Sequence, residues 1–253
     1  MTAIRAASIN EFRVIGQIKT INVSFVEMKN LFILTIRKNY IPMLLLVISG
    51  CEKSNNTIIS SIDTTSSVSI GSQNWMKFNL NTSKFRNGDV IKNAITDKEW
   101  NDAYISKKPA WCYRNNDSTN GLKYGKLYNW FAIIDSRGLA PVGWHMPSDK
   151  EWTELSTTLG GQSNAGIKLK SKSGWFNGGN GTNESGFNGL PGGRRIDEGL
   201  FQDPNKEGYW WSATDGPFAD TDAWAVSIYF IDANLNIFPD GKGSGLSVRC
   251  VKD

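Results

Sequence analysis

The pattern of polar and apolar positions predicts two short helices in the middle of the chain. At residues 96–99 and 148–151 a Thr or Ser is followed three positions later by Glu, which is the capping-box pattern of a helix start. Apolar residues then recur at helical spacing. We therefore predict helices over residues 97–105 and 149–159, the second ended by Gly160-Gly161. A third, short and buried helix is expected where Leu127, Phe131 and Ile134 would share one face.

Strands are predicted mainly in the last part of the chain, where aromatic and β-branched residues gather between turn signals. The predicted strands cover residues 73–80, 209–212, 223–230 and 245–251. Between them, residues 160–208 are rich in Gly, Asn and Ser and read as long Gly-rich loops. Two or three helices followed by mainly antiparallel strands predict a single α+β domain.

An apolar run at residues 40–51, preceded by Arg37 and Lys38, is too short for a membrane span of ~20 residues and is typical of a secretory signal. Its end, Ile-Ser-Gly-Cys, resembles a bacterial lipobox, in which Cys51 would be lipidated. The alternative is a buried strand that ends in Gly-Cys by chance. We expect an upstream extension at 1–27, a lipoprotein signal peptide at 28–50, a Ser/Thr/Asn-rich tether at 51–69 and a domain at 70–253.

The net charge of +4 lies wholly in residues 1–51, and the rest of the chain holds 22 basic and 22 acidic residues. Phosphate backbones are bound by clustered basic side chains, and the largest cluster here is Arg194-Arg195. A nucleic-acid partner is therefore not expected. The predicted location is the cell envelope, at the outer membrane, with membrane attachment through the lipid alone.

Six motifs occur in a fixed order along the domain. They are Gly-Ser-Gln-Asn-Trp-Met at 71–76, Tyr-Gly-Lys-Leu-Tyr-Asn-Trp at 124–130, Ala-Pro-Val-Gly-Trp-His-Met-Pro at 140–147, Gly-Phe-Asn-Gly-Leu-Pro-Gly-Gly-Arg at 186–194, Tyr-Trp-Trp-Ser-Ala-Thr at 209–214 and Ser-Val-Arg-Cys-Val at 247–251. Together they closely resemble the Fibrobacter succinogenes major paralogous domain, a family of secreted and lipid-anchored proteins in Bacteroidetes-like bacteria. The resemblance implies a C-type-lectin-like fold, related to that of formylglycine-generating enzymes.

Many members of that family carry Cys-Pro where this chain has Ala140-Pro141, so a bridge at that position is absent here. Cys112 and Cys250 remain in the mature domain, and an oxidising compartment would favour a disulfide between them. C-type-lectin-like folds often join an early helical region to the last strand in this way. Two free buried thiols are the alternative. Formylglycine chemistry uses a cysteine pair near the end of the domain, and this chain offers only Cys250 there.

Catalytic and metal sites find little support in the sequence. The single histidine, His145, is interpreted as a turn or core residue that hydrogen-bonds the backbone, with a general base as the alternative. Zinc sites need three or four clustered ligands, which one histidine and no Cys-x-x-Cys pair do not provide. Asp215, Asp220 and Asp222 are weak calcium candidates on one loop, for which a solvated acidic loop is the favoured interpretation.

Several aromatic residues are candidates for stacking on sugar rings, with Arg194 nearby in the sequence. The candidate ligand-binding residues are Trp175, Tyr209, Trp210, Trp211 and Arg194. Neighbouring side chains of a strand face opposite ways, so at most one of Trp210 and Trp211 is exposed on a given face. We expect a noncatalytic domain that binds a glycan or surface polymer through loops between residues 160 and 245. The alternatives are a structural or protein-interaction module of the envelope and, third, an unrecognised hydrolase.

Overall fold

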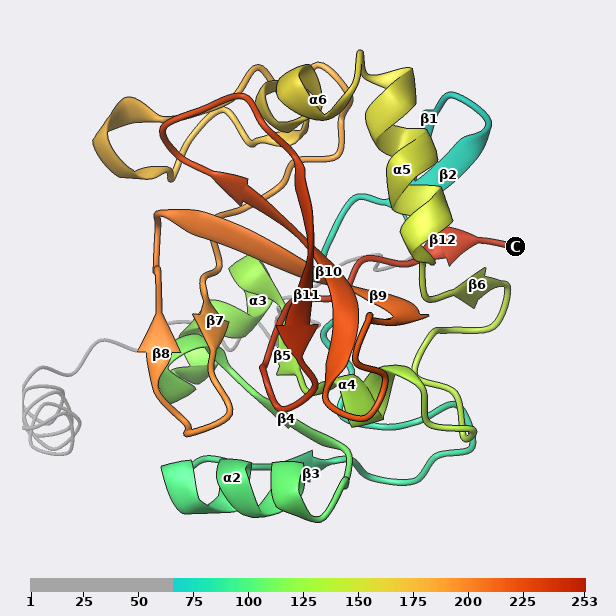
Figure 1. Cartoon of the computed structure of the whole chain (residues 1–253), viewed down its shortest axis with the longest axis vertical. Helices are drawn as coiled ribbons and strands as arrows, with labels where there is room; N and C mark the ends of the chain where they lie inside the picture. The colour runs from blue at the N-terminus through green and yellow to red at the C-terminus, as the bar shows by residue number, and fades with distance from the viewer. Residues whose placement is uncertain (1–65) are drawn as a thin grey trace, which may run out of the picture. The chain divides into compact units, whose positions relative to one another are not determined.

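The computed structural model describes residues 66–253, which form a mixed α+β domain with mostly antiparallel sheets (Figure 1). The lipidation candidate Cys51 and the predicted signal peptide lie outside the described residues. The first strand starts at Ser67, slightly before the predicted domain start. Within residues 66–253, no helix combines the length and apolar character that crossing a membrane requires.

A four-stranded sheet joins the beginning and the end of the domain. Its strand order is β1 (Ser67–Ile70), β2 (Gln73–Met76), β12 (Val251–Lys252) and β6 (Trp144–His145), and every pairing is antiparallel. The β1–β2 hairpin turns through Gly71, whose φ of +60° is accessible to glycine at no steric cost. In Figure 1 the C-terminus accordingly lies next to β6 and the β1–β2 hairpin.

The longest strands form a three-stranded antiparallel sheet in the order β11, β10, β9. β9 spans Glu207–Asp215, β10 spans Asp222–Tyr229 and β11 spans Asn236–Gly241. The sequence predicted the centres of β9 and β10 and did not predict β11. The register of β10 against β9 shifts between Ala223 and Ala225, whereas β10 pairs with β11 without interruption.

Two smaller sheets complete the strand arrangement. β3 (Lys92–Asn93) pairs in parallel with β4 (Ala110–Cys112), which pairs antiparallel with β5 (Leu127–Tyr128). β7 (Arg194–Arg195) and β8 (Phe201–Gln202) form an antiparallel pair.

The two capped helices are confirmed. α2 spans Asp97–Ile105 and α5 spans Asp149–Thr158, and each starts with a complete capping box. In each box a Thr or Ser oxygen accepts a hydrogen bond from the N3 backbone, and the N3 glutamate bonds back to the cap residue. These starts were predictable because every group in the box lies within four consecutive residues.

The other helices differ from the prediction. α3 (Gly121–Tyr124) and α4 (Trp130–Ile133) are single turns, and α6 (Gln162–Leu169) was predicted as loop. The helix expected across Leu127 and Ile134 is shorter than predicted, because Leu127 belongs to β5 and Ile134 is exposed. Three-residue 3-10 helices cover Arg114–Asn116, Ser118–Asn120 and Phe176–Gly178.

The predicted strand at 245–251 is regular only from Val251. Before that point the chain is held by isolated bridges, from Gly245 to Arg195, from Leu246 to Tyr128 and from Ser247 to Trp210. This segment therefore connects several sheets instead of extending one of them.

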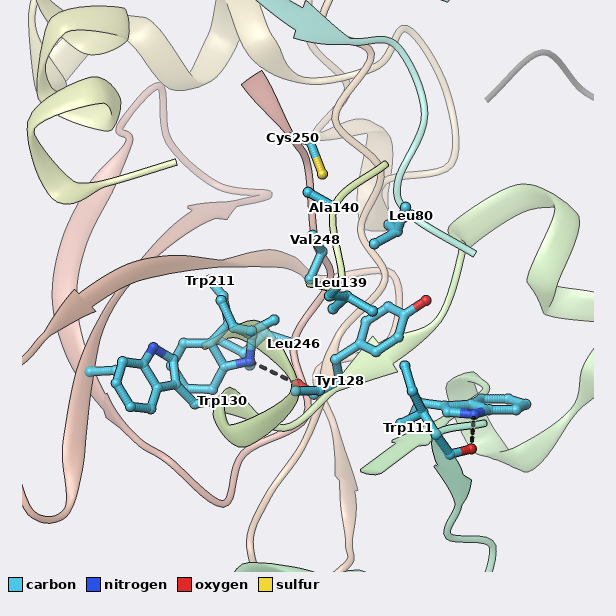
Figure 2. Close-up of a cluster of buried hydrophobic side chains, with 14 of the residues drawn as sticks. Leu80, Trp111, Tyr128, Trp130, Leu139, Ala140, Trp211, Leu246, Val248 and Cys250 are labelled. Carbon is cyan, nitrogen blue, oxygen red and sulfur yellow. Dashed lines mark hydrogen bonds between the residues drawn. The ribbon is translucent and has the colours of Figure 1, made fainter. Parts of the chain in front are cut away.

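The core has three parts, and the first two lie on opposite faces of β9 and β10. The Trp211 cluster includes Tyr209, Trp211, Ala223 and Ala225 and is shown in Figure 2. The Trp210 cluster includes Val226 and Ile228 and is covered by α5 and α6 through Trp152, Leu155, Ala165 and Leu169. A smaller Trp100 cluster packs α2 against β4 and β5, through Trp100, Ala103, Ala110, Cys112 and Leu127.

Candidate functional site

The aromatic residues predicted to bind a ligand are core residues. Trp175, Tyr209, Trp210 and Trp211 are all buried, so their prediction as an exposed stacking surface is wrong. The physical reason is that β9 is covered on both faces, by the Trp211 cluster on one and the Trp210 cluster on the other. Alternation along the strand then places each tryptophan in a different cluster and exposes neither.

Hydrogen bonds confirm that these tryptophans are built into the interior. The indole N–H of Trp210 donates to Oδ1 of Asn79 at 2.9 Å, and that of Trp211 donates to the Tyr128 carbonyl at 2.8 Å (Figure 2). The indole N–H of Trp175 donates to Oγ of Ser171 at 3.0 Å. Buried indoles are normally satisfied in this way, which leaves none of the three donors for a ligand.

Arg194 is also engaged within the domain. Its Nη1 lies 3.0 Å from Oδ2 of Asp240, its Nη2 donates to Oε1 of Gln202 at 3.2 Å, and its guanidinium lies over the Tyr209 ring. Tyr209 in turn donates its hydroxyl to Glu207, and Asp203 lies 3.0 Å from the same oxygen. The structure thus brings Arg194 and Tyr209 together as a packed ion-pair cluster and not as an open binding surface.

The three aspartates proposed as weak calcium candidates do not gather at one point. Asp215 is paired with Nζ of Lys242 at 2.6 Å, and that lysine also lies 3.9 Å from the centre of the Trp130 ring. Across residues 66–253, no three His, Cys, Asp or Glu side chains gather closely enough to hold a metal ion. Asp215, Asp220 and Asp222 therefore do not form a cluster of carboxylate ligands.

The predicted disulfide does not form in the structure. Cys112 lies in the Trp100 cluster and Cys250 in the Trp211 cluster, and both are free and buried. Burial raises the pKa of each thiol to about 12. Cys250 shares its cluster with Ala140 (Figure 2).

His145 links α5 to the last residue through two carboxylates, and not to the backbone as expected. Its Nε2 lies 2.6 Å from Oε1 of Glu151, and its Nδ1 lies 2.8 Å from Oδ1 of Asp253. Partial burial alone would lower the pKa of His145, but the hydrogen bonds to the two carboxylates outweigh it and raise the pKa. Both ring nitrogens are occupied, which favours a structural role for this side chain.

Trp224 differs from every other tryptophan of the chain. Nine of the ten tryptophans are buried, and Trp224 is only half-buried. It lies near the start of β10, on the face that carries Val226 and Ile228. Those two residues enter the Trp210 cluster, whereas Trp224 does not belong to it and is only half-buried.

A cavity of about 290 Å³ lies against Trp224. It is lined by Asp149 and Thr153 from α5, Gln162 from the start of α6, Trp224 from β10 and Ile237 from β11. Ile237 pairs directly with Val226 across the sheet, so it shares a face with Trp224. The cavity therefore combines one aromatic surface and one aliphatic side chain with three polar groups.

The polar groups of this cavity are held by hydrogen bonds to neighbouring elements. Oδ1 of Asp149 accepts from the Thr214 hydroxyl at 2.9 Å, and the Thr153 hydroxyl donates to the Asp149 carbonyl at 2.9 Å. The backbone carbonyl of Gln162 accepts from the Leu235 N–H at 2.8 Å, which fixes the start of α6. The second carboxylate oxygen of Asp149 and the amide of Gln162 offer hydrogen-bonding groups to a ligand.

A second cavity, of about 190 Å³, lies between residues 82–86 and 139–141. Arg86 is its most conspicuous polar side chain, and it donates through Nε and Nη2 to the Ala140 carbonyl at 3.1 and 3.0 Å. Its guanidinium therefore joins the two walls, and the Trp224 cavity remains the better candidate for ligand binding.

Trp224 was missed because the Trp210-Trp211 pair was the more conspicuous sequence feature. A signal did exist: Ala223 and Ala225 are small enough for a crowded core face, which places Trp224 on the other side of the strand. That alternation predicts the face of Trp224 but not its exposure. Exposure depends on where α5 and α6 begin, and α6 was not predicted.

The fold and the site define a single α+β domain that carries one half-buried tryptophan beside a polar cavity. The family model of the Fibrobacter succinogenes major domain matches residues 68–252. Because this match covers more than half of the chain, the chain belongs to that family. No curated protein and no solved structure matches it.

Proposed function

We propose that this domain binds a glycan or surface polymer through the Trp224 cavity and performs no chemistry on it. The proposal rests on Trp224, the one tryptophan of ten that is only half-buried. Its side chain lines a cavity together with Asp149, Thr153 and Gln162. An indole face packs against the C–H surface of a sugar ring, while carboxylate, hydroxyl and amide groups bind its hydroxyls.

Binding is favoured over hydrolysis by the number of carboxyl groups. Glycosidases place two carboxyl groups on either side of the bond that they cleave. Asp149 is the one carboxylate among the five residues that line the cavity. The same proposal includes a C-type-lectin-like fold and a noncatalytic role. The fold is proposed because of the family resemblance.

The proposal also includes attachment of the chain to the cell envelope through a lipid on Cys51. Support comes from the sequence, where Arg37 and Lys38 precede an apolar run that ends in Ile-Ser-Gly-Cys. In the bacterial cell, the Cys51→Ala variant is expected to leave the membrane fraction and to lose its acyl chains, as measured by fractionation and mass spectrometry. Unchanged membrane attachment of that variant would refute the anchor.

A glycan array probed with the purified full-length chain tests the binding function. The Trp224→Ala variant should lose about tenfold to hundredfold in affinity, because an aromatic anchor in a binding site contributes on the order of 1–3 kcal/mol. Phe218→Ala is the matched control, since Phe218 is an exposed aromatic residue on the β9–β10 loop and does not line the cavity.

The control should bind as the wild type does, and both variants should keep the wild-type melting temperature. Equal binding by wild type and Trp224→Ala would exclude this cavity as the site. If the chain binds no glycan on the array and another protein co-purifies with it, the protein-interaction module is favoured instead.

A further inference from the structure

We propose that the Trp224 cavity ranks saccharides by charge, binding amino and neutral sugars and rejecting uronic acids and sulfated sugars. The inference rests on the proposed function and adds its substrate class. The first observation is the lining itself. Asp149 is its one ionisable side chain, and none of its five residues is basic.

The second observation concerns the charges at this end of the sheet. Asp240 and Asp215 are neutralised, by Arg194 at 3.0 Å and by Lys242 at 2.6 Å. Within residues 66–253, neither Asp149 nor Asp222 takes part in an ion pair of this kind. These two ion pairs lie on the other face of the sheet, over the Tyr209 and Trp130 rings, so Asp149 is the one charged side chain that lines the cavity.

Asp222 lies on the same face of β10 as Trp224. It precedes Trp224 by two positions in a strand that pairs with β11 without a register shift, so both residues lie on the same face. Asp222 does not itself line the cavity, so it acts at longer range than Asp149. A ligand stacked on the Trp224 ring would place an added negative charge near the Asp149 carboxylate.

Two of the three polar groups lead to the same ranking, whereas the Gln162 amide can both donate and accept and does not discriminate. Asp149 offers a carboxylate oxygen, and Thr153 has already donated its proton to the Asp149 carbonyl, so its oxygen can only accept. Hydroxyl and ammonium groups donate to such acceptors, whereas a carboxylate or sulfate cannot. Repulsion between like charges a few ångströms apart adds a penalty of about tenfold in affinity at low salt.

The test is an array of neutral, amino, uronic and sulfated oligosaccharides built on matched glucose, galactose and mannose backbones, probed with the full-length chain. We expect amino and neutral glycans to bind, and acidic counterparts to bind about tenfold more weakly in low salt. The difference in affinity between these two groups of glycans should become smaller at high ionic strength. The Asp149→Asn variant keeps an oxygen that can accept from the Thr214 hydroxyl. It should also reduce the difference in affinity between neutral and acidic glycans.

Asp102→Asn is the matched control, because Asp102 is an exposed aspartate of α2 and lies outside the cavity. It should leave the ranking unchanged. Acidic glycans that bind as tightly as their neutral counterparts would overturn the charge selection and leave glycan binding intact. An array on which nothing binds would overturn the proposed function and, with it, this inference.

Discussion

Arg249 shows how single residues set the stability of the domain. It is fully buried without a carboxylate partner, and its Nε and Nη2 donate to Oδ1 of Asn79 at 3.0 and 2.7 Å. Its Nη1 donates to the carbonyls of Met76 and Phe187, and its guanidinium lies over the Phe187 ring. Burial lowers the pKa of Arg249 to about 9, and the charge is retained because carbonyl oxygens surround it.

Replacing Asn79 should therefore lower the stability of the domain more than the size of its side chain suggests. Its Oδ1 serves both Arg249 and the Trp210 indole, so Asn79→Ala leaves a buried cation short of an acceptor. We expect the free energy of unfolding to fall by about 3–5 kcal/mol, measured by urea denaturation. Asn87→Ala, which removes an exposed turn contact to the Asp89 N–H, should cost less than about 1 kcal/mol. A similar small loss for Asn79→Ala would contradict this role.

Glu207 makes stability depend on pH. Burial and the neighbouring Asp203 raise the pKa of Glu207 to about 7, against the opposing charge of Arg194. Between its ordinary pKa and about 7 the folded state binds more protons than the unfolded state, so stability falls as pH rises through that window. Glu207→Gln should match the wild type at pH 4 and exceed its free energy of unfolding by about 1–2 kcal/mol at pH 8.

The control for this experiment is Glu198→Gln, which makes the same change at an exposed position. Its free energy of unfolding should differ from that of the wild type by less than about 0.5 kcal/mol. If Glu207→Gln also showed a constant difference between pH 4 and pH 8, a raised pKa at Glu207 would be wrong.

At the scale of elements, the sequence predicts what is encoded locally. α2 and α5 were predictable because their capping boxes and apolar spacing lie within the helices. α6 was not, since its N-cap is Gly161 with a φ of +85° and no side chain caps it. Trp210 and Trp211 were misjudged because the burial of β9 on both faces depends on segments distant in sequence.

Gly166 shows how a segment distant in sequence constrains α6. Alanine normally stabilises a helix relative to glycine by up to about 1 kcal/mol, but a Cβ at this position would overlap the carbonyl of Asn234. Gly166→Ala should therefore lower the free energy of unfolding by about 1–3 kcal/mol in urea denaturation. Ser163→Ala, at an exposed position of the same helix, should be neutral or slightly stabilising. A stabilised Gly166→Ala variant would mean that α6 does not pack against residue 234.

At the scale of the whole molecule, the tryptophans of the domain serve almost entirely to build its own core. Nine tryptophans are buried, and the two faces of β9 and β10 are covered by separate clusters. Trp224 remains at the edge of one face, where α5, α6 and β11 supply polar and aliphatic neighbours. The family and the α+β class were predictable from ordered motifs, whereas this site emerges only when four separate segments meet.

The most direct measurement follows the ten indole N–H signals in a ¹H–¹⁵N NMR spectrum during titration with a saccharide, with Trp224→Phe used to assign one of them. Binding at the proposed cavity predicts a saturable shift of the Trp224 signal while the nine buried indoles stay in place. Saturable binding that moves other indole signals and leaves that of Trp224 unchanged would contradict the site.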